Sequence, residues 1–228
     1  MFGQHHSPLS ISRGARWLRR AFRTSKRAPS FTHSQEYWEQ RYASGGHSGA
    51  GSYKKFAQFK ADTLNRFVSE HGIRTVIEFG CGDGNQLLLA QYPQYLGIDV
   101  SPTAIGLCRR LFEADNTKTF RLLADYSGES AELALSLDVI YHLVEDSVFA
   151  DYMHTLFGAA QRYVIVYASN FDDPEQQAGP HVRHRQFTDW VASHCPHWQL
   201  IEHIPNKYPY QGNYRKGSFA DFYVFRKI

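Results

Sequence analysis

The sequence predicts an α/β fold: a mostly parallel sheet of seven strands, with helices on both faces and an antiparallel strand at the C-terminal end. Three observations carry this prediction. Strand-like and helical segments alternate from residue 73 onward, which is typical of a parallel sheet. The last two strands follow each other without a helix, which favours antiparallel pairing. The 228 residues, of which 43% are hydrophobic, suffice for one sizeable core.

The chain begins with a strongly basic arm. Residues 1–30 hold seven of the 25 lysines and arginines and no acidic residue, so the remaining chain is slightly acidic. Ile11, Ala15, Leu18 and Phe22 follow helical spacing. The arm is therefore an amphipathic helix on an anionic membrane surface, a contact to nucleic acid, or a flexible, solvated tail.

Residues 31–72 are predicted to form two helices joined by a glycine-rich loop. The segment YWEQRY favours a short helix, and residues 43–52 contain four glycines. Apolar residues then recur at helical spacing up to Gly72, which is a suitable C-cap. The aromatic side chains of this region either form a lid over a ligand or pack the helix on the sheet; they are Tyr37, Trp38, Tyr42 and Tyr53.

The domain from residue 73 to residue 228 supplies the alternating elements. The predicted strands are residues 74–80, 94–101, 119–125, 132–139, 162–169, 198–204 and 218–228. The predicted helices are residues 85–92, 101–115, 147–160 and 187–194. Ser101 opens the second of these helices, with Pro102 at its first position.

Composition also excludes several classes of protein. The three cysteines are far apart and form no CxxC pair, so neither a disulfide scaffold nor a metal site is expected. No apolar run is long enough to span a membrane, and the N-terminus lacks the apolar core of a secretory signal. We therefore expect a cytoplasmic protein, with the basic arm as a means of contact with the inner membrane face.

The segment VIEFGCGDGNQ, residues 76–86, indicates a ligand site. A strand followed by glycines at 80, 82 and 84 lets a ligand approach the main chain. Asn85 stands where a dinucleotide fingerprint would have its third glycine, and Glu78 would repel a pyrophosphate but attract an ammonium group. Of the two candidate ligands, this favours S-adenosylmethionine over a nicotinamide cofactor.

These residues resemble the first motif of the class I S-adenosylmethionine-dependent methyltransferases, which have a Rossmann-like fold. GIDVS at residues 97–101 resembles their second motif, and AD at 124–125 ends the next strand. The resemblance implies that Asp99 accepts the ribose hydroxyls and that Asp125 meets the adenine amino group. The predicted cofactor-binding residues are Glu78, Gly80, Gly82, Gly84, Gln86, Asp99, Val100 and Asp125, together with Tyr42 from the lid.

The segment SLDVIYHLVED, residues 136–146, follows the fourth strand and would face the transferred methyl group. His142 is predicted to be the general base, since its ordinary pKa lies near neutral pH; otherwise it only hydrogen-bonds the backbone. Asp138 would orient His142 or the acceptor, and Tyr141 would contact the acceptor. Glu145 and Asp146 are expected to open the next helix.

The segment PHVRHRQF, residues 180–187, is expected to overhang the same pocket. Arginine binds phosphate and carboxylate groups bidentately, so this loop predicts an anionic acceptor unless it is merely solvated. The acceptor-binding residues predicted here and in neighbouring segments are Tyr53, His181, Arg183, His184, Arg185 and Tyr208.

The sequence thus predicts an enzyme that methylates an oxygen of a small or carbohydrate-linked, anionic acceptor. The combined motifs look similar to bacterial methyltransferases of surface-polysaccharide and phosphate-modifying pathways. The rival hypotheses are an RNA methyltransferase, disfavoured by the acidic body, and a non-catalytic binding protein with the same fold. The oligomeric state is left open.

Overall fold

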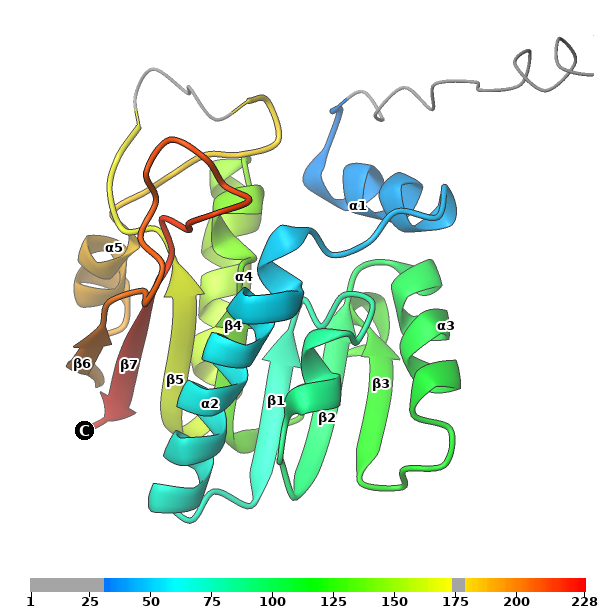
Figure 1. Ribbon diagram of the computed structural model, residues 1–228. Helices are drawn as coiled ribbons and strands as arrows, with labels where there is room; N and C mark the ends of the chain where they lie inside the picture. The colour runs from blue at the N-terminus through cyan, green and yellow to red at the C-terminus, as the bar shows by residue number, and fades with distance from the viewer. Residues whose placement is uncertain (1–30, 174–178) are drawn as a thin grey trace, which may run out of the picture.

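The computed structural model describes residues 31–173 and 179–228, and its centre is a seven-stranded sheet (Figure 1). The strand order is β3-β2-β1-β4-β5-β7-β6. The strands are β1 (Thr75–Phe79), β2 (Gln94–Asp99), β3 (Lys118–Leu122), β4 (Ala131–Leu137), β5 (Ala160–Ala168), β6 (Trp198–Ile204) and β7 (Asp221–Lys227).

Strands β1 to β5 are parallel, and β7 pairs antiparallel with both β5 and β6. The predicted sheet and its antiparallel terminal strand are therefore confirmed, with β7 placed between β5 and the edge strand β6. The order reverses at β1, because the chain first runs outward to β3 and then returns to β4 beside β1. In open α/β sheets, ligands bind at such a switch point, beyond the carboxyl ends of the strands.

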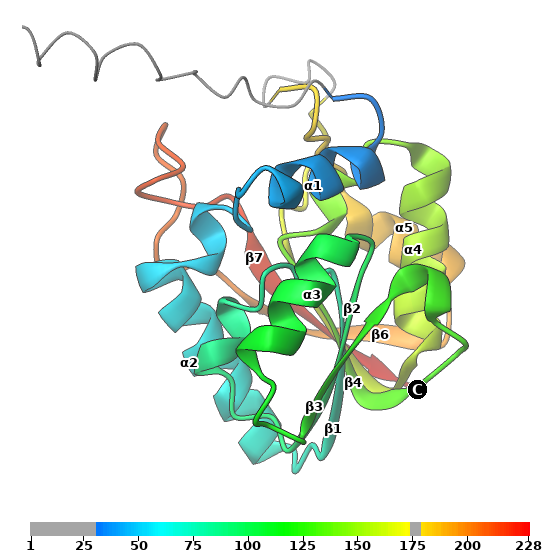
Figure 2. The same ribbon diagram turned by 90° about the vertical axis from the view of Figure 1, so that its right-hand side faces the viewer.

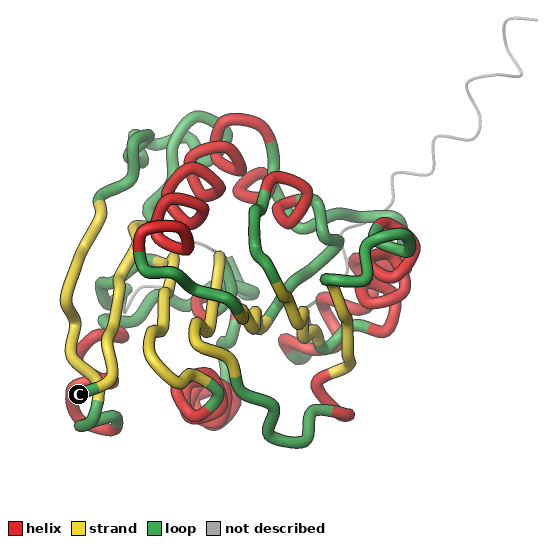
Figure 3. Tube along the Cα trace, turned by 90° about the horizontal axis from the view of Figure 1, so that it is seen from below, coloured by secondary structure: helices red, strands yellow, loops and turns green. Residues whose placement is uncertain are grey.

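Helices cover both faces of the sheet, as Figure 3 shows from below. The α-helices are α1 (Ser34–Ala43), α2 (Lys54–Glu70), α3 (Pro102–Leu111), α4 (Asp146–Gly158) and α5 (Phe187–His194). The Ser101 hydroxyl accepts a hydrogen bond from the backbone N–H of Ala104 and caps α3 as predicted. Gly72 adopts a left-handed conformation (φ 59°) directly after His71, the C-cap of α2.

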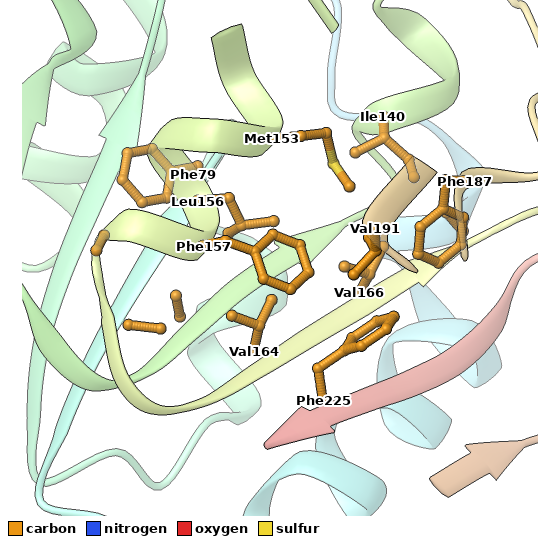
Figure 4. Packing of buried hydrophobic residues seen from close by; sticks show 14 of the residues in the cluster. Phe79, Ile140, Met153, Leu156, Phe157, Val164, Val166, Phe187, Val191 and Phe225 are labelled. Atoms are coloured by element: carbon orange, nitrogen blue, oxygen red, sulfur yellow. The ribbon is translucent and has the colours of Figure 1, made fainter. Parts of the chain in front are cut away.

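Each face of the sheet has its own apolar core. On one face, Leu64 and Phe67 of α2 and Ile105 of α3 pack against the sheet. On the other, Met153 of α4 and Phe187 of α5 pack against β4, β5 and β7 (Figure 4). A strand buried on both faces reads as a continuous apolar run, as residues 164–168 of β5 do.

One predicted element differs. The helix expected at residues 85–92 is a single 3-10 turn, η3 (Gln86–Leu89). The Asn65 side chain bonds the Leu89 carbonyl and the Gln91 N–H and so replaces the continuing helical bonds. Pro93 also disfavours helix at the residue before it.

Helix α1 lies across the carboxyl-terminal edge of the sheet (Figure 2). The Glu145 carboxylate accepts hydrogen bonds from the Ser34 N–H (3.1 Å) and hydroxyl (2.6 Å) at the start of α1. Glu39 accepts hydrogen bonds from the hydroxyls of Ser101 (2.5 Å) and Thr103 (2.6 Å) at the start of α3. Carboxylates thus fix α1 above the switch point. Within the described residues, no helix has the length and apolarity needed to cross a membrane.

Candidate functional site

A cavity of about 360 Å³ lies at the carboxyl ends of β1, β2 and β4, beneath α1. This volume is within the usual range for small-molecule sites. The glycine loop and strand ends supply Glu78, Gly80, Gly82, Asp99, Val100 and Asp138 to its wall. Helices and other loops supply Trp38, Tyr42, Lys60, Gln86, Leu123 and His142.

The glycine loop is held in a shape that other residues would not adopt. Gly80 (φ 83°) and Gly82 (φ 58°) both have left-handed backbones, which disfavour a side chain. A Cβ on Gly82 would lie 2.4 Å from Ser48 Oγ and 2.9 Å from the Tyr42 hydroxyl. Gly84 instead packs against α3, where a Cβ would lie 3.0 Å from Cys108 Sγ. Only the first two glycines therefore shape the cavity wall.

Asp99 is buried at the end of β2 and faces the cavity. Its Oδ2 accepts a hydrogen bond from the Gly82 N–H (2.8 Å), and its Oδ1 accepts one from the Ser101 N–H (2.9 Å). Burial raises its pKa to about 6, although the hydrogen bonds from backbone N–H groups oppose this. Each oxygen keeps a further lone pair for a ligand donor.

Glu78 is buried near the end of β1, and its Oε2 accepts a hydrogen bond from the Tyr95 hydroxyl (2.8 Å). Burial raises its pKa to about 7, against the lowering effects of the Tyr95 hydrogen bond and of the Lys60 charge. A nearby cation would stabilise the ionised form of this carboxyl.

Gln86 presents an unsatisfied acceptor in the cavity wall. Its Nε2 donates to the Ala57 carbonyl (3.0 Å), while its buried Oε1 has no hydrogen-bond partner among the described residues. A buried polar atom without a partner is costly, so this oxygen suits a ligand that brings an N–H or O–H group.

Asp125 does not line the cavity with Glu78, Gln86 and Asp99. Strand β3 ends at Leu122 and continues as a 3-10 turn, so that Leu123 lines the cavity while Asp125, two residues further, is exposed to solvent. The structure therefore does not bring Asp125 into the cavity wall with the other predicted cofactor-binding residues.

Asp138 is held by a partly buried network. Its Oδ2 lies 2.7 Å from Nζ of Lys60, which is fully buried, and its Oδ1 accepts a hydrogen bond from the Tyr141 hydroxyl (2.7 Å). The left-handed backbone of Asp138 (φ 61°) is rare for a residue with a side chain and marks a constrained position. The Tyr141 hydroxyl thus contacts Asp138, and within the described residues no hydrogen bond joins Asp138 to His142.

His142 lines the cavity from the 3-10 turn η5 (Ile140–His142) after β4. Its Nδ1 lies 3.0 Å from the His181 carbonyl, which can only accept, so Nδ1 carries the hydrogen. Burial lowers the pKa of His142 to about 4. The ring is therefore neutral near pH 7, with an unprotonated Nε2.

The arginines of residues 180–187 turn away from the cavity, contrary to prediction. Arg185 donates to the carbonyls of Leu143 (2.7 Å) and Val144 (2.8 Å), and both Arg183 and Arg185 pair with Asp146 at 3.0 Å. Both arginines therefore donate to backbone carbonyls directly after the turn that carries His142, and so stabilise that turn.

The other predicted acceptor contacts also have structural partners. The His181 ring stacks on Tyr37 at 4.9 Å, and His184 lies 2.6 Å from the Ser169 hydroxyl. Tyr53 donates to Asp83 (2.8 Å) and so ties the lid segment to the glycine loop. Tyr208 packs between Phe56 and Lys55.

Solved structures share this architecture at low sequence identity. The N-methyltransferase NodS from Bradyrhizobium japonicum, in complex with S-adenosyl-L-homocysteine, aligns with a TM-score of 0.67 at 15% identity, over 86% of this chain and 99% of that chain. The magnesium protoporphyrin IX methyltransferase ChlM from Synechocystis aligns with a TM-score of 0.59 at 17% identity, over 75% and 83%. This chain has the class I methyltransferase fold. No family model and no curated protein matches it.

Within this methyltransferase fold, two contributors to the site escaped the sequence-based prediction. Lys60 lies four residues from both Phe56 and Leu64, on the apolar stripe of α2, and this spacing could have indicated a buried lysine. Glu145 occupies the N-cap position of α4 as expected, but its carboxylate makes no capping hydrogen bond and instead accepts one from Ser34, which is 111 residues away. No local signal indicates that contact.

Proposed function

We propose that this protein transfers a methyl group from S-adenosylmethionine to an oxygen of a small or carbohydrate-linked acceptor. The observation that carries the proposal is the convergence of Glu78, Asp99 and the glycine loop on one cavity at the switch point of a methyltransferase fold. A pyrophosphate would meet two buried carboxylates there, whereas a cationic nucleoside would be attracted.

The residues of the cavity fit this cofactor. Asp99 would accept the two ribose hydroxyls, since its carboxylate keeps free lone pairs. Val100 and Leu123 would contact the adenine, as both line the cavity. Glu78 and the partnerless Oε1 of Gln86 would accept hydrogen bonds from the ammonium group.

Lys60 and the lid complete this binding site. Lys60 is the buried cation of the wall and would attract the cofactor's carboxylate in competition with Asp138. Tyr42 and Trp38 of α1 lie over the cavity and would exclude water from it. The bound cofactor supplies a methyl group already activated by the neighbouring sulfonium.

His142 is the proposed base. Its neutral ring presents Nε2 as an acceptor, so it can align an acceptor hydroxyl and remove its proton as the new O–C bond forms. The low pKa makes His142 a weak base. Proton transfer then accompanies methyl transfer instead of preceding it, or the acceptor hydroxyl is itself acidic.

An anionic acceptor was predicted because Arg183 and Arg185 were expected to bind it. Both arginines lie outside the cavity wall, so this argument no longer applies. The wall instead contains a single lysine, Lys60, beside four acidic residues, which are Glu78, Asp99, Asp138 and Glu145. These charges favour an uncharged hydroxyl at the reacting position.

Calorimetric titration with S-adenosylhomocysteine tests the proposal. We expect one binding site per chain, and turnover of labelled S-adenosylmethionine with sugar and glycan-linked hydroxyl acceptors. Absence of cofactor binding by the intact protein would contradict the proposal. Binding without transfer to any acceptor would support the rival of a non-catalytic binding protein.

A further inference from the structure

A basic surface adjoins the cavity at the carboxyl-terminal edge of the sheet. It consists of five exposed cations, which we call the basic rim: Lys54, Lys55, Lys207, Arg215 and Lys216. The first two begin α2, two residues after Ser52 of the cavity wall, and the others come from the loop between β6 and β7. Figure 1 shows this loop, in orange to red, beside the start of α2.

Specific contacts join the two segments of the basic rim. Lys55 Nζ donates to the Lys216 carbonyl (2.7 Å) and lies 4.3 Å from the centre of the Tyr208 ring. The Phe56 ring meets the same tyrosine edge-on, with centroids 5.9 Å apart. The cations are therefore held as one surface.

The charge of the basic rim is not balanced locally. Residues 50–58 and 205–219 contain no Asp or Glu, although the chain beyond residue 30 has more acidic than basic residues. Two large aromatic side chains stand out on the same loop, Tyr210 (47% exposed) and Tyr214 (67% exposed). A patch of cations attracts an anionic surface. The exposed tyrosine rings beside it can insert at the polar boundary of such a surface.

We propose that the basic rim docks this protein on an anionic lipid bilayer, with the cavity edge facing the headgroups. Lysine and tyrosine at a loop tip are residue types that favour the membrane–water interface. The Phe31 ring packs on Tyr37 of α1, with ring centroids 6.0 Å apart, and α1 lies at this same edge; the seven cations of residues 1–30 precede Phe31 in the sequence. Docking here would bring a membrane-held acceptor to the cavity, and the proposal does not depend on the identity of that acceptor.

Co-sedimentation of the full chain with vesicles tests the inference. The vesicles are phosphatidylcholine alone, or an equimolar mixture of phosphatidylcholine and phosphatidylglycerol. We expect binding to the anionic vesicles only, and its loss at high salt. The triple variant Lys207→Gln, Arg215→Gln, Lys216→Gln should bind about a hundredfold more weakly, at roughly fivefold per cation.

A matched variant controls for net charge. Arg66→Gln, Arg74→Gln and Arg226→Gln also remove three exposed cations, but from positions away from the cavity edge, and should change binding less than about threefold. Equal losses in the two triple variants would overturn the docking surface.

Preferential binding of single-stranded RNA over anionic vesicles, weakened by the rim variant, would reassign the surface to nucleic acid and also overturn the proposal. Calorimetry with S-adenosylhomocysteine should give the same affinity in both triple variants. The membrane result is thereby separate from the proposed function.

Discussion

The two sides of the cavity are assembled in different ways. On the β1–β2 side, Glu78, the glycine loop and Asp99 stand at or directly after the ends of neighbouring strands. On the opposite side, His142 and Asp138 depend on partners distant in the chain, such as Lys60 and the His181 carbonyl. The first side is set by local sequence, and the second by tertiary contacts.

The largest expected effect tests whether the β4 side performs the chemistry. His142→Ala should lower kcat by about 10²–10⁴-fold, the usual contribution of a general base, with little change in S-adenosylhomocysteine affinity. His181→Ala is the control, because it removes the imidazole but keeps the carbonyl that His142 Nδ1 contacts. Similar kcat losses in both variants would argue against a base at His142.

The second prediction concerns the ion pair between Lys60 and Asp138. Lys60→Met leaves the Asp138 carboxylate, whose side chain is only 13% exposed, without its cation, which should lower the free energy of unfolding by about 3 kcal/mol, the lower end of the range for fully buried pairs. The double variant Lys60→Met, Asp138→Asn should recover part of this loss. Denaturant unfolding measures both, and an unchanged midpoint for Lys60→Met would show that the pair does not organise this side.

The third prediction distinguishes two roles of Arg185, stabilisation of the turn after β4 and binding of the acceptor. Arg185→Lys keeps the charge but cannot bond two carbonyls at once, and should lower the free energy of unfolding by about 1–3 kcal/mol. Arg183→Lys, at a more exposed arginine, should cost less. A large rise in acceptor KM without a change in thermal stability would instead place Arg185 at the acceptor.

The smallest effect is a pH dependence on the β1 side. The raised pKa of Glu78, about 7, means that the carboxyl gains its charge as the pH rises from 6 to 8. An ammonium-bearing ligand should therefore bind about tenfold more tightly at pH 8 than at pH 6 and release a proton from Glu78. In the ligand-free protein, the folded state favours the protonated form of Glu78. The contribution of this group to the free energy of unfolding is therefore lost as the pH rises through 7 and the carboxyl ionises.

Calorimetry in buffers of different ionisation enthalpy measures this proton release. The variant Glu78→Gln should show a nearly flat affinity over the same range. A pH profile identical to that of the unmodified protein would assign the titration to another group, such as Asp99, whose raised pKa is about 6.

The contrast between local sequence and tertiary contacts also explains which features could be predicted from the sequence. The strands, the cap at Ser101 and the glycine loop depend on nearby residues, and the structure places them where the pattern indicated. Lys60 was also accessible in principle, through its position on the apolar stripe of α2.

The arginines could not be placed from sequence. An arginine in a loop is equally able to bind a ligand phosphate or a backbone carbonyl, and only the tertiary position of Leu143 and Val144 decides between them. Asp125 shows the same limit at smaller scale, because a single 3-10 turn after β3 determines that Leu123 and not Asp125 faces the cavity.

The most direct test of cofactor binding compares two aspartates by calorimetry with S-adenosylhomocysteine, in variants whose folding is checked by circular dichroism. Asp99→Ala should weaken binding by at least about a hundredfold, since it removes both predicted ribose contacts. Asp125→Ala, at an exposed position outside the cavity wall, should leave the affinity within about twofold. Undiminished binding by Asp99→Ala, or an equal loss in both variants, would contradict the account.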